Sequence, residues 1–202
     1  MQKESRDKRY QEITRKNEPR HLAMLLDKYM LKEMSIIDIG CGAGNDSLYF
    51  LNKGHSVLAI DRETSIIEKE KSQLQNVAQK RLQIIQDDFI EMELPKVDVL
   101  YASFSLPFCP PQKFNELWIS ITNSIKPRGI FAGIFFGEND EWFGEPQYLT
   151  FHKHEDIQQL LQGYLIKEFH DKEYEGTFVD PDGNIKNKHW HIYEVIAIKM
   201  EK

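Results

Sequence analysis

The chain has 202 residues, of which 41% are hydrophobic and 11% aromatic, and its formal net charge is −6. This length suits one compact domain with a sizeable core and leaves no room for a second one. The acidic balance, without a Lys/Arg cluster interleaved with aromatics, argues against nucleic-acid binding, so we expect a small-molecule substrate.

The first 17 residues are charged almost throughout and lack the apolar centre of a signal peptide, and no apolar run reaches membrane-spanning length. We therefore expect a cytoplasmic protein without a membrane partner, as a monomer or weak homodimer. Cys41 and Cys109 lack CxxC spacing, which predicts free thiols. Residues 1–33 are expected to form a helical cap on a single α/β core of residues 34–202.

Amphipathic stretches and short apolar runs alternate along the chain from residue 20 onwards. Such alternation indicates a Rossmann-like α/β fold of about seven mostly parallel strands, with helices on both faces of the sheet. The predicted helices cover residues 20–33, 45–52, 64–79, 112–125 and 154–162, and the predicted strands cover residues 36–39, 57–60, 82–85, 97–102, 130–136, 165–169 and 191–198.

The last two predicted strands are joined by residues 171–188, a polar stretch that contains Gly176, Pro181 and Gly183. It has no room for a crossover helix, so we expect a hairpin-like return. A return without a crossover reverses the chain, which predicts that the last strand is antiparallel to its neighbours.

Three glycines, Gly40, Gly42 and Gly44, follow the first predicted strand. Ligands of open α/β sheets bind beyond the carboxyl ends of the strands, where glycine lets the backbone approach them. A dinucleotide fingerprint would need glycine where this chain has Asn45, and the Gly-Lys-Ser/Thr ending of a phosphate loop is absent. With Asp38 two residues before it, the turn suits a ligand that carries a cationic amino acid portion and no phosphate.

Acidic residues end the next two strands. Asp61 lies about twenty residues beyond the first glycine, where a carboxylate accepts both ribose hydroxyls. After the third strand, Asp88 offers a carboxylate for the exocyclic amine of adenine, and Phe89 offers an aromatic face. Acids at successive strand ends are more specific than the glycine motif alone.

On these residues the chain resembles, from about residue 20 to residue 199, the class I S-adenosylmethionine-dependent methyltransferases. Within them it is similar to the small tellurite-resistance-like and thiopurine-methyltransferase-like branch. The resemblance implies a strand order of 3-2-1-4-5-7-6 with the last strand reversed. It further implies that S-adenosylmethionine is held at its methionine portion by Asp38, Gly40, Cys41, Gly42 and Gly44, at its ribose by Asp61 beside Arg62, and at its adenine by Asp88 and Phe89.

The fourth predicted strand leads into residues 97–108, which resemble the family segment that passes under the sulfonium and faces the substrate; Ser103 is its expected cofactor contact. Members that methylate adenine or amide nitrogens carry Asn/Asp-Pro-Pro-aromatic here, and this chain does not. This difference argues against DNA and glutamine methylation. The resemblance also favours an N-terminal aromatic, Tyr10, that closes over the cofactor.

Methyl transfer from a sulfonium is an in-line displacement that needs no covalent enzyme intermediate, so orientation and desolvation supply most of the catalysis. An aromatic face beside the sulfur contributes on the order of 0.5–2 kcal/mol by cation–π attraction. The candidates are Tyr10, Tyr101 and Phe104. Substrate contacts are expected from Phe108, Trp142 and Trp190, and His189 or His191 is the predicted general base.

Simpler interpretations compete with several of these roles. The glycines could form a tight turn without a ligand, Asp61 and Asp88 could cap helices, and Phe89 and Tyr10 could be packing residues. Two His-x-His pairs, 152/154 and 189/191, could bind a metal, but no partner spacing accompanies them and we expect no metal. Methyl transfer also needs no nucleophile such as Cys109.

Two other functions compete with methyl transfer. A nicotinamide-dependent dehydrogenase on a Rossmann sheet is disfavoured by Asn45 and by the reversed last strand. A non-catalytic protein that senses S-adenosylmethionine would need no substrate pocket, whereas Phe108, Trp142 and Trp190 suggest one.

Overall fold

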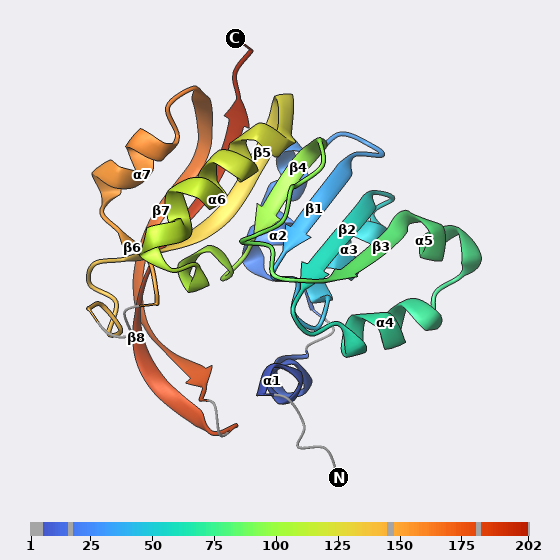
Figure 1. The fold of residues 1–202 in the computed structure, drawn as a ribbon, viewed down its shortest axis with the longest axis horizontal. Helices are drawn as coiled ribbons and strands as arrows, with labels where there is room; N and C mark the ends of the chain where they lie inside the picture. Colours follow the sequence, from blue (N-terminus) through green and yellow to red (C-terminus); the bar gives the residue numbers. More distant parts are fainter. Residues whose placement is uncertain (1–5, 16–17, 145–147, 181–182, 202) are drawn as a thin grey trace.

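The computed structural model describes residues 6–15, 18–144, 148–180 and 183–201. Within these residues eight strands form one sheet in the order β3-β2-β1-β4-β5-β8-β7, with β6 paired to β5 (Figure 1). The strands are β1 (Ser35–Ile39), β2 (Ser56–Asp61), β3 (Leu82–Gln86), β4 (Val97–Ala102), β5 (Ile125–Gly137), β6 (Phe151–His152), β7 (Tyr164–Val179) and β8 (Ile185–Lys199). The helices are α1 (Arg6–Thr14), α2 (His21–Leu26), α3 (Asn45–Asn52), α4 (Ser65–Ser72), α5 (Asn76–Arg81), α6 (Pro111–Ser124) and α7 (His154–Leu160), with short 3-10 turns η1 (Asp27–Tyr29) and η2 (Leu106–Phe108).

The predicted fold class is confirmed. Apart from the two-residue β6, the sheet has the predicted order, and β8 runs antiparallel to both β5 and β7. The pairs β1–β2, β1–β4, β2–β3 and β4–β5 are parallel, so their carboxyl ends meet at one edge of the sheet. No helix in the described part of the chain has both the length and the apolar character needed to cross a membrane.

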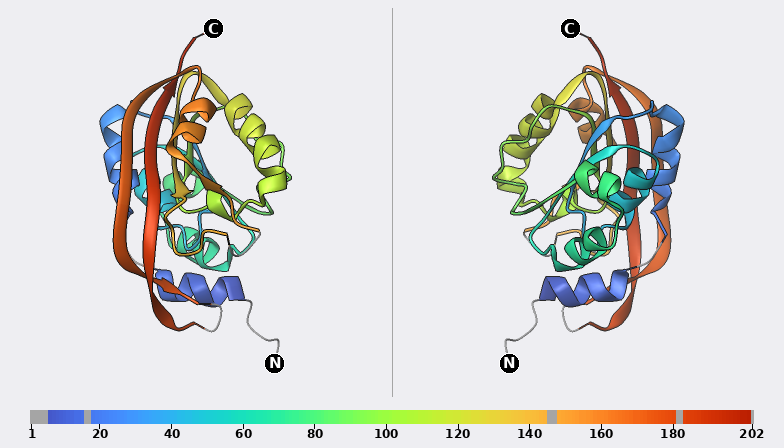
Figure 2. Two further views of the ribbon diagram at one scale, coloured as in Figure 1. Left: turned by 90° about the vertical axis from the view of Figure 1, so that its left-hand side faces the viewer. Right: turned by 90° about the vertical axis from the view of Figure 1, so that its right-hand side faces the viewer.

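The sheet is buried on both faces, which is why its central strands are apolar at nearly every position. Figure 2 shows α2 on one side of the sheet and α6 on the other, with α1 lying across one end. One core cluster joins Leu22 and Leu26 of α2 to Phe50 of α3 and the sheet. A second cluster packs Phe114 and Trp118 of α6 on the opposite face.

Two predicted helices are shorter or broken. The helix expected over residues 20–33 ends as α2 at Leu26 and passes through η1, and Glu33 has a left-handed φ of 59°. The helix expected over residues 64–79 divides into α4 and α5, because Gln75 is extended and Leu74 packs against the core at the break. In both places tertiary packing outweighs helical periodicity.

The hairpin-like return expected over residues 171–188 is present, but the two strands that it joins are longer than predicted, because most of this stretch is β-structure. Strands β7 and β8 pair without interruption from Phe169 to Val179, opposite Val195 to Ile185. A hydrophobicity pattern does not detect this pairing, because the paired residues carry polar side chains and the hydrogen bonds between strands involve only backbone groups. Of the expected turn residues, Pro181 lies outside the described residues, and Gly176 lies within β7, where a Cβ would meet the Trp190 ring.

A buried ion pair ties this hairpin to the segment after β5. Lys188 on β8 donates a hydrogen bond to the Asp140 carboxylate, and both side chains are fully buried. The Lys188 ammonium lies 3.8 Å from the ring centroid of Trp190 and 4.4 Å from that of Trp142. Burial lowers the pKa of Lys188, against the opposing effect of Asp140. The pair fixes the aromatic side chains at the carboxyl end of β5.

Removal of this ammonium leaves a buried carboxylate without its partner. We expect Lys188→Met to lower the free energy of unfolding by about 3–5 kcal/mol, and Lys188→Met/Asp140→Asn to recover most of that loss. Lys186→Met, on the exposed part of the same strand, is the control and is expected to change it by less than about 0.5 kcal/mol. Urea unfolding measures all three; a double variant no more stable than Lys188→Met would contradict this account.

Candidate functional site

The glycine turn after β1 has a backbone that only glycine adopts readily. Gly40, Gly42 and Gly44 have φ values of 68°, 55° and 84°. A Cβ on Gly40 would lie 2.5 Å from the Ser105 Cβ, and one on Gly44 would lie 2.6 Å from Ile67. At Gly42 a Cβ would meet nothing within 4 Å. The turn is therefore held tightly at both ends and open in the middle, where a ligand can approach the backbone.

Asp61, at the end of β2, holds this turn from the neighbouring strand. Its Oδ2 accepts the Gly42 N–H at 2.8 Å, and its Oδ1 accepts the Glu63 N–H at 3.0 Å. The turn also extends the β1–β2 pairing, because the Gly40 N–H donates to the Ile60 carbonyl at 2.8 Å. Burial raises the pKa of Asp61 despite these two backbone hydrogen bonds. The carboxylate thus lies beside the open part of the turn.

A second acidic group lies under the turn. Asp38 on β1 is 2% exposed and accepts a hydrogen bond from Ser47 at 2.5 Å. Burial, with the nearby Asp46 carboxylate, raises the pKa of Asp38 to about 7. Asp46 accepts hydrogen bonds from the Arg20 backbone N–H at 2.7 Å and from the Tyr101 hydroxyl at 2.9 Å. This arrangement favours a cation, because a positive group beside Asp38 restores its charge.

The remaining predicted cofactor residues differ in what they contact. Phe89 faces Gly40, since a Cβ there would lie 3.6 Å from its ring, and Asp88 accepts the Ile90 N–H at 3.1 Å. Cys41 is buried, which raises the pKa of its thiol. Ser103 is buried after β4, whereas Tyr10 is 44% exposed and Arg62 reaches Asp7 at 3.7 Å.

Helix α1 covers this edge of the sheet, and it contributes a residue that the sequence did not reveal. Gln11 is 2% exposed, and its Nε2 donates to the Glu63 carbonyl at 2.7 Å and to Asp61 Oδ1 at 3.3 Å. Its Oε1 is buried and has no partner among the described residues, and the same holds for the Ser105 hydroxyl beside Gly40. A nucleoside with ribose hydroxyls and an amino acid portion supplies hydrogen-bonding groups for such atoms, so the residues present fit S-adenosylmethionine.

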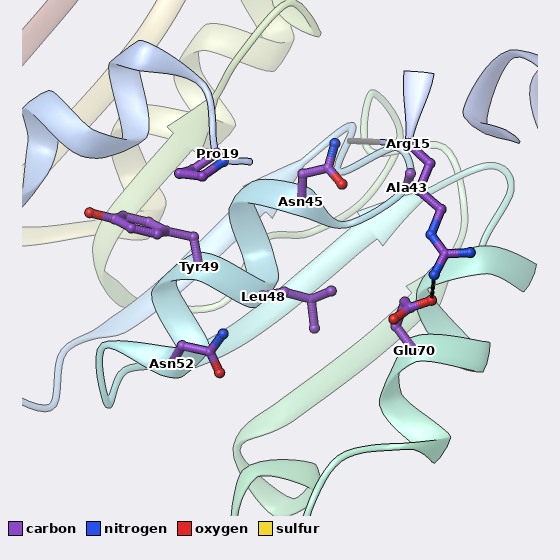
Figure 3. A pocket seen from close by; sticks show the side chains of 8 residues that line it. All are labelled: Arg15, Pro19, Ala43, Asn45, Leu48, Tyr49, Asn52 and Glu70. Carbon is purple, nitrogen blue, oxygen red and sulfur yellow. Dashed lines mark hydrogen bonds and ion pairs between the residues drawn. The ribbon is translucent and has the colours of Figure 1, made fainter. Parts of the chain in front are cut away.

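An ion pair fastens the end of α1 to α4. Arg15 bonds to Glu70 beside a pocket of about 190 Å³ that borders Ala43 and Asn45 on the outer side of the glycine turn (Figure 3). The other end of α1 meets the β7–β8 turn, where a Cβ on Gly183 would collide with the Arg9 guanidinium. Helix α1 therefore spans the carboxyl edge from α4 to the hairpin.

Beyond β4 and β5 the structure gathers the predicted substrate aromatics around Phe136. The Trp190 ring centroid lies 5.7 Å from that of Phe136 and 5.6 Å from that of Trp142, and Phe108 lies 6.1 Å from Phe136. Phe104, the second residue beyond β4, has its ring centroid 5.7 Å from that of Trp190 and has a left-handed φ of 56°. Such a backbone in a bulky residue marks a position where the surroundings hold the chain under strain.

The two histidines predicted as general base lie on the other face of β8, with Tyr193. His191 is buried; its Nδ1 accepts the Asn139 N–H at 3.0 Å, and its Nε2 lies 2.9 Å from Asp171. His189 lies between Glu175 at 2.8 Å and Glu173 at 3.2 Å, and these glutamates raise its pKa. Both ring nitrogens of each histidine are engaged in these contacts.

The other His-x-His pair also lacks a metal arrangement. His152 is buried between the rings of Phe114 and Phe135, and burial lowers its pKa to about 4. His154 contacts Gln158 at 2.9 Å. In the part of the chain that the structure describes, no three His, Cys, Asp or Glu side chains are grouped to hold a metal ion.

Residues 36–129 match a protein family described as a methyltransferase domain. Among curated proteins, the carboxy-S-adenosyl-L-methionine synthase of Erwinia tasmaniensis is 23% identical over 157 residues, which are 75% of this chain and 62% of that protein. The enzyme of the same name from Vibrio atlanticus is 25% identical over 114 residues, 54% of this chain and 47% of its own. The matched part of this chain thus spans about three fifths of the length of the Erwinia tasmaniensis enzyme.

Solved structures share the fold. The 1,6-didemethyltoxoflavin-N1-methyltransferase of Burkholderia thailandensis, solved with 1,6-didemethyltoxoflavin and S-adenosylhomocysteine, gives a TM-score of 0.67 at 18% identity, over 90% of this chain and 78% of that one. TehB from Haemophilus influenzae gives a TM-score of 0.70 at 15% identity, over 88% of this chain and 61% of that one.

The raised pKa of Asp38 predicts a pH dependence of ligand binding. Because Asp38 ionises near pH 7, its charged fraction rises about tenfold between about pH 6 and pH 8. An ammonium group is attracted only to the ionised form, so we expect the Kd of S-adenosylhomocysteine to fall by up to about tenfold over this range. Calorimetry of wild type and Asp38→Asn checks this: an equal slope in both would exclude Asp38 as the cause.

Proposed function

Since residues 36–129 match a methyltransferase domain and the fold is shared with solved methyltransferases, we propose that the chain transfers the methyl group of S-adenosylmethionine to a small-molecule acceptor. The observation that carries this proposal is the position of Asp61, whose carboxylate bonds to the Gly42 N–H and lies under Gln11 of α1. A carboxylate at this place accepts ribose hydroxyls.

Three regions of the chain would hold the cofactor. Asp38 and the glycine turn suit the methionine portion, Asp61 and Gln11 suit the ribose, and Phe89 beside Gly40 suits the adenine. S-adenosylmethionine supplies an electrophilic methyl group on a sulfonium. The residues of the chain orient the reactants and exclude water, and the aromatic ring of Phe104, two residues beyond β4, favours a nearby positive charge.

The acidic composition of the chain and the size of a cavity support the proposal that the methyl acceptor is a small molecule. The chain is acidic overall, and one of its cavities measures about 310 Å³, which is a dimension for a small molecule. The fold is shared with TehB from Haemophilus influenzae, and a place in the tellurite-resistance-like branch stays a proposal. We keep the proposal of a cytoplasmic monomer or weak homodimer that acts without nucleic acid.

The activity is tested by labelled methyl transfer from S-adenosylmethionine to a panel of thiols, phenols, amines, tellurite and selenite. We expect at least one acceptor to be labelled, and Asp61→Asn to weaken cofactor binding by about 10- to 100-fold, since it loses charge-assisted hydrogen bonds. Asp87→Asn is the matched control, because Asp87 is an exposed carboxylate at the end of the adjacent strand.

Cofactor binding without transfer to any acceptor would favour a sensor of S-adenosylmethionine over an enzyme. Tight NAD binding without binding of S-adenosylmethionine would replace the proposal by a dehydrogenase. Equal weakening by Asp61→Asn and Asp87→Asn would remove the assigned role of Asp61.

A further inference from the structure

A cavity of about 310 Å³ lies between the start of α2 and the β7–β8 hairpin. Its apolar walls are the ring of Phe104 and the side chains of Ile134 and Ile192, and Tyr174 adds a second aromatic ring. Its polar lining comes from Arg20, His21, Lys172 and Glu194. The cavity therefore offers flat apolar walls with charged groups at defined points, which suits a small planar molecule.

Glu194 organises the polar lining from a buried position. It is 3% exposed, and its Oε1 lies 3.0 Å from His21 Nδ1 and 3.1 Å from Lys172 Nζ. A carboxylate at this distance accepts the Nδ1–H of the imidazole and so leaves the lone pair on Nε2. His21 Nε2 has no hydrogen-bond partner among the residues that the structure describes. The pair has the geometry of an oriented base, in contrast to His189 and His191.

The cavity adjoins the candidate cofactor site through Arg20 and Phe104. Arg20 bonds through its backbone and its guanidinium to Asp46, in the first turn of α3 directly after the glycine turn. The same guanidinium lies 5.7 Å from the centroid of the Phe104 ring, which lines the cavity. One end of the cavity is therefore shared with the segment that follows β4.

On this geometry we propose that the cavity binds the methyl acceptor, that the acceptor is a small aromatic acid with a hydroxyl or thiol group, and that His21 accepts its proton. This inference rests on the proposed methyl transfer. Phe104 and Tyr174 contact the ring of the acceptor, and Lys172 with Arg20 attracts its carboxylate. Glu194 is a positioning residue, because it acts through His21.

The step balances without a further reactant. The acceptor oxygen or sulfur forms a bond to the methyl carbon while the S–CH₃ bond breaks, and the electron pair of that bond stays on the cofactor sulfur. The proton of the hydroxyl or thiol passes to His21 Nε2 and then to solvent, since the His21 side chain is 61% exposed. The groups facing His21 are Glu194 and, across the cavity, Lys172, Tyr174 and Arg20.

Binding is tested by NMR on the full chain with labelled isoleucine methyl groups, saturated with S-adenosylhomocysteine. We expect 4-hydroxybenzoate and 2-mercaptobenzoate to shift the methyl signals of Ile134 and Ile192, and not those of Ile121 and Ile157 in the core on the opposite face. Lys172→Gln is expected to weaken both probes about tenfold, whereas Lys167→Gln, an exposed lysine of the same strand, is expected to leave them unchanged.

Comparison of the two probes also distinguishes a general-base role of His21 from a purely structural role. We expect His21→Gln to lower kcat for 4-hydroxybenzoate by about 100-fold or more near pH 8, and to lower kcat for 2-mercaptobenzoate much less, because a thiol ionises without help. For the hydroxyl probe, Glu194→Gln is expected to shift the pH profile. In NMR spectra of labelled histidine it is expected to reduce the Nδ1–H tautomer of His21.

If S-adenosylhomocysteine binds but neither probe shifts the methyl signals of Ile134 and Ile192, the proposed acceptor site is wrong. The proposed methyl transfer would stand in that case. Equal losses of kcat for the two probes in His21→Gln, or no methylation of bound probe by wild type, would overturn the assigned base. Absence of S-adenosylhomocysteine binding would instead refute the proposed function itself.

Discussion

The carboxylate of Asp61 is the interaction on which the rest of the candidate site depends. One oxygen accepts the Gly42 N–H and the other accepts the Glu63 N–H and the Gln11 amide. Three segments far apart in sequence therefore meet at one side chain: the turn after β1, the end of β2 and helix α1. Because a buried carboxylate without donors is costly, this convergence is built into the stability of the fold.

The open sheet explains why these groups meet where they do. Parallel strands bring β1, β2, β4 and β5 to one edge, so residues that follow each strand become neighbours. The glycine turn lies at the first strand end and Asp61 at the second, while Phe104 and the aromatic cluster lie beyond the fourth and fifth. The antiparallel hairpin of β7 and β8 then closes one side of this edge, and the buried Lys188–Asp140 pair anchors it.

The alternation of apolar periods and turn residues along the sequence was sufficient to predict the fold class and the glycine turn, and the family resemblance supplied the strand order. Residues 45–52 and 97–102 form a helix and a strand with the predicted bounds, because the first segment has buried residues at helical spacing and the second is a short, almost continuously buried run. The long hairpin was not predictable in this way: residues 171–179 carry charged side chains, and only their backbone pairing makes them a strand. Prediction failed where tertiary contacts, and not local preference, decide the conformation.

The same limit applies to the site. Glycines and strand-end acids have a fixed spacing along the chain, so Asp38 and Asp61 could be proposed from sequence. Gln11 lies fifty residues from Asp61, and His21 lies 173 residues from Glu194; no local pattern connects either pair. Conversely, the segment that contains His189 and His191 was expected to face the substrate, whereas their ring nitrogens are engaged on the other face of β8.

The most direct test is a crystal structure of the chain with S-adenosylhomocysteine. The account predicts that the ribose hydroxyls bond to Asp61, that the amino group lies near Asp38, and that the sulfur faces Phe104. A nucleoside found elsewhere on the surface, with Asp61 still bonded only to Gly42, Glu63 and Gln11, would contradict it.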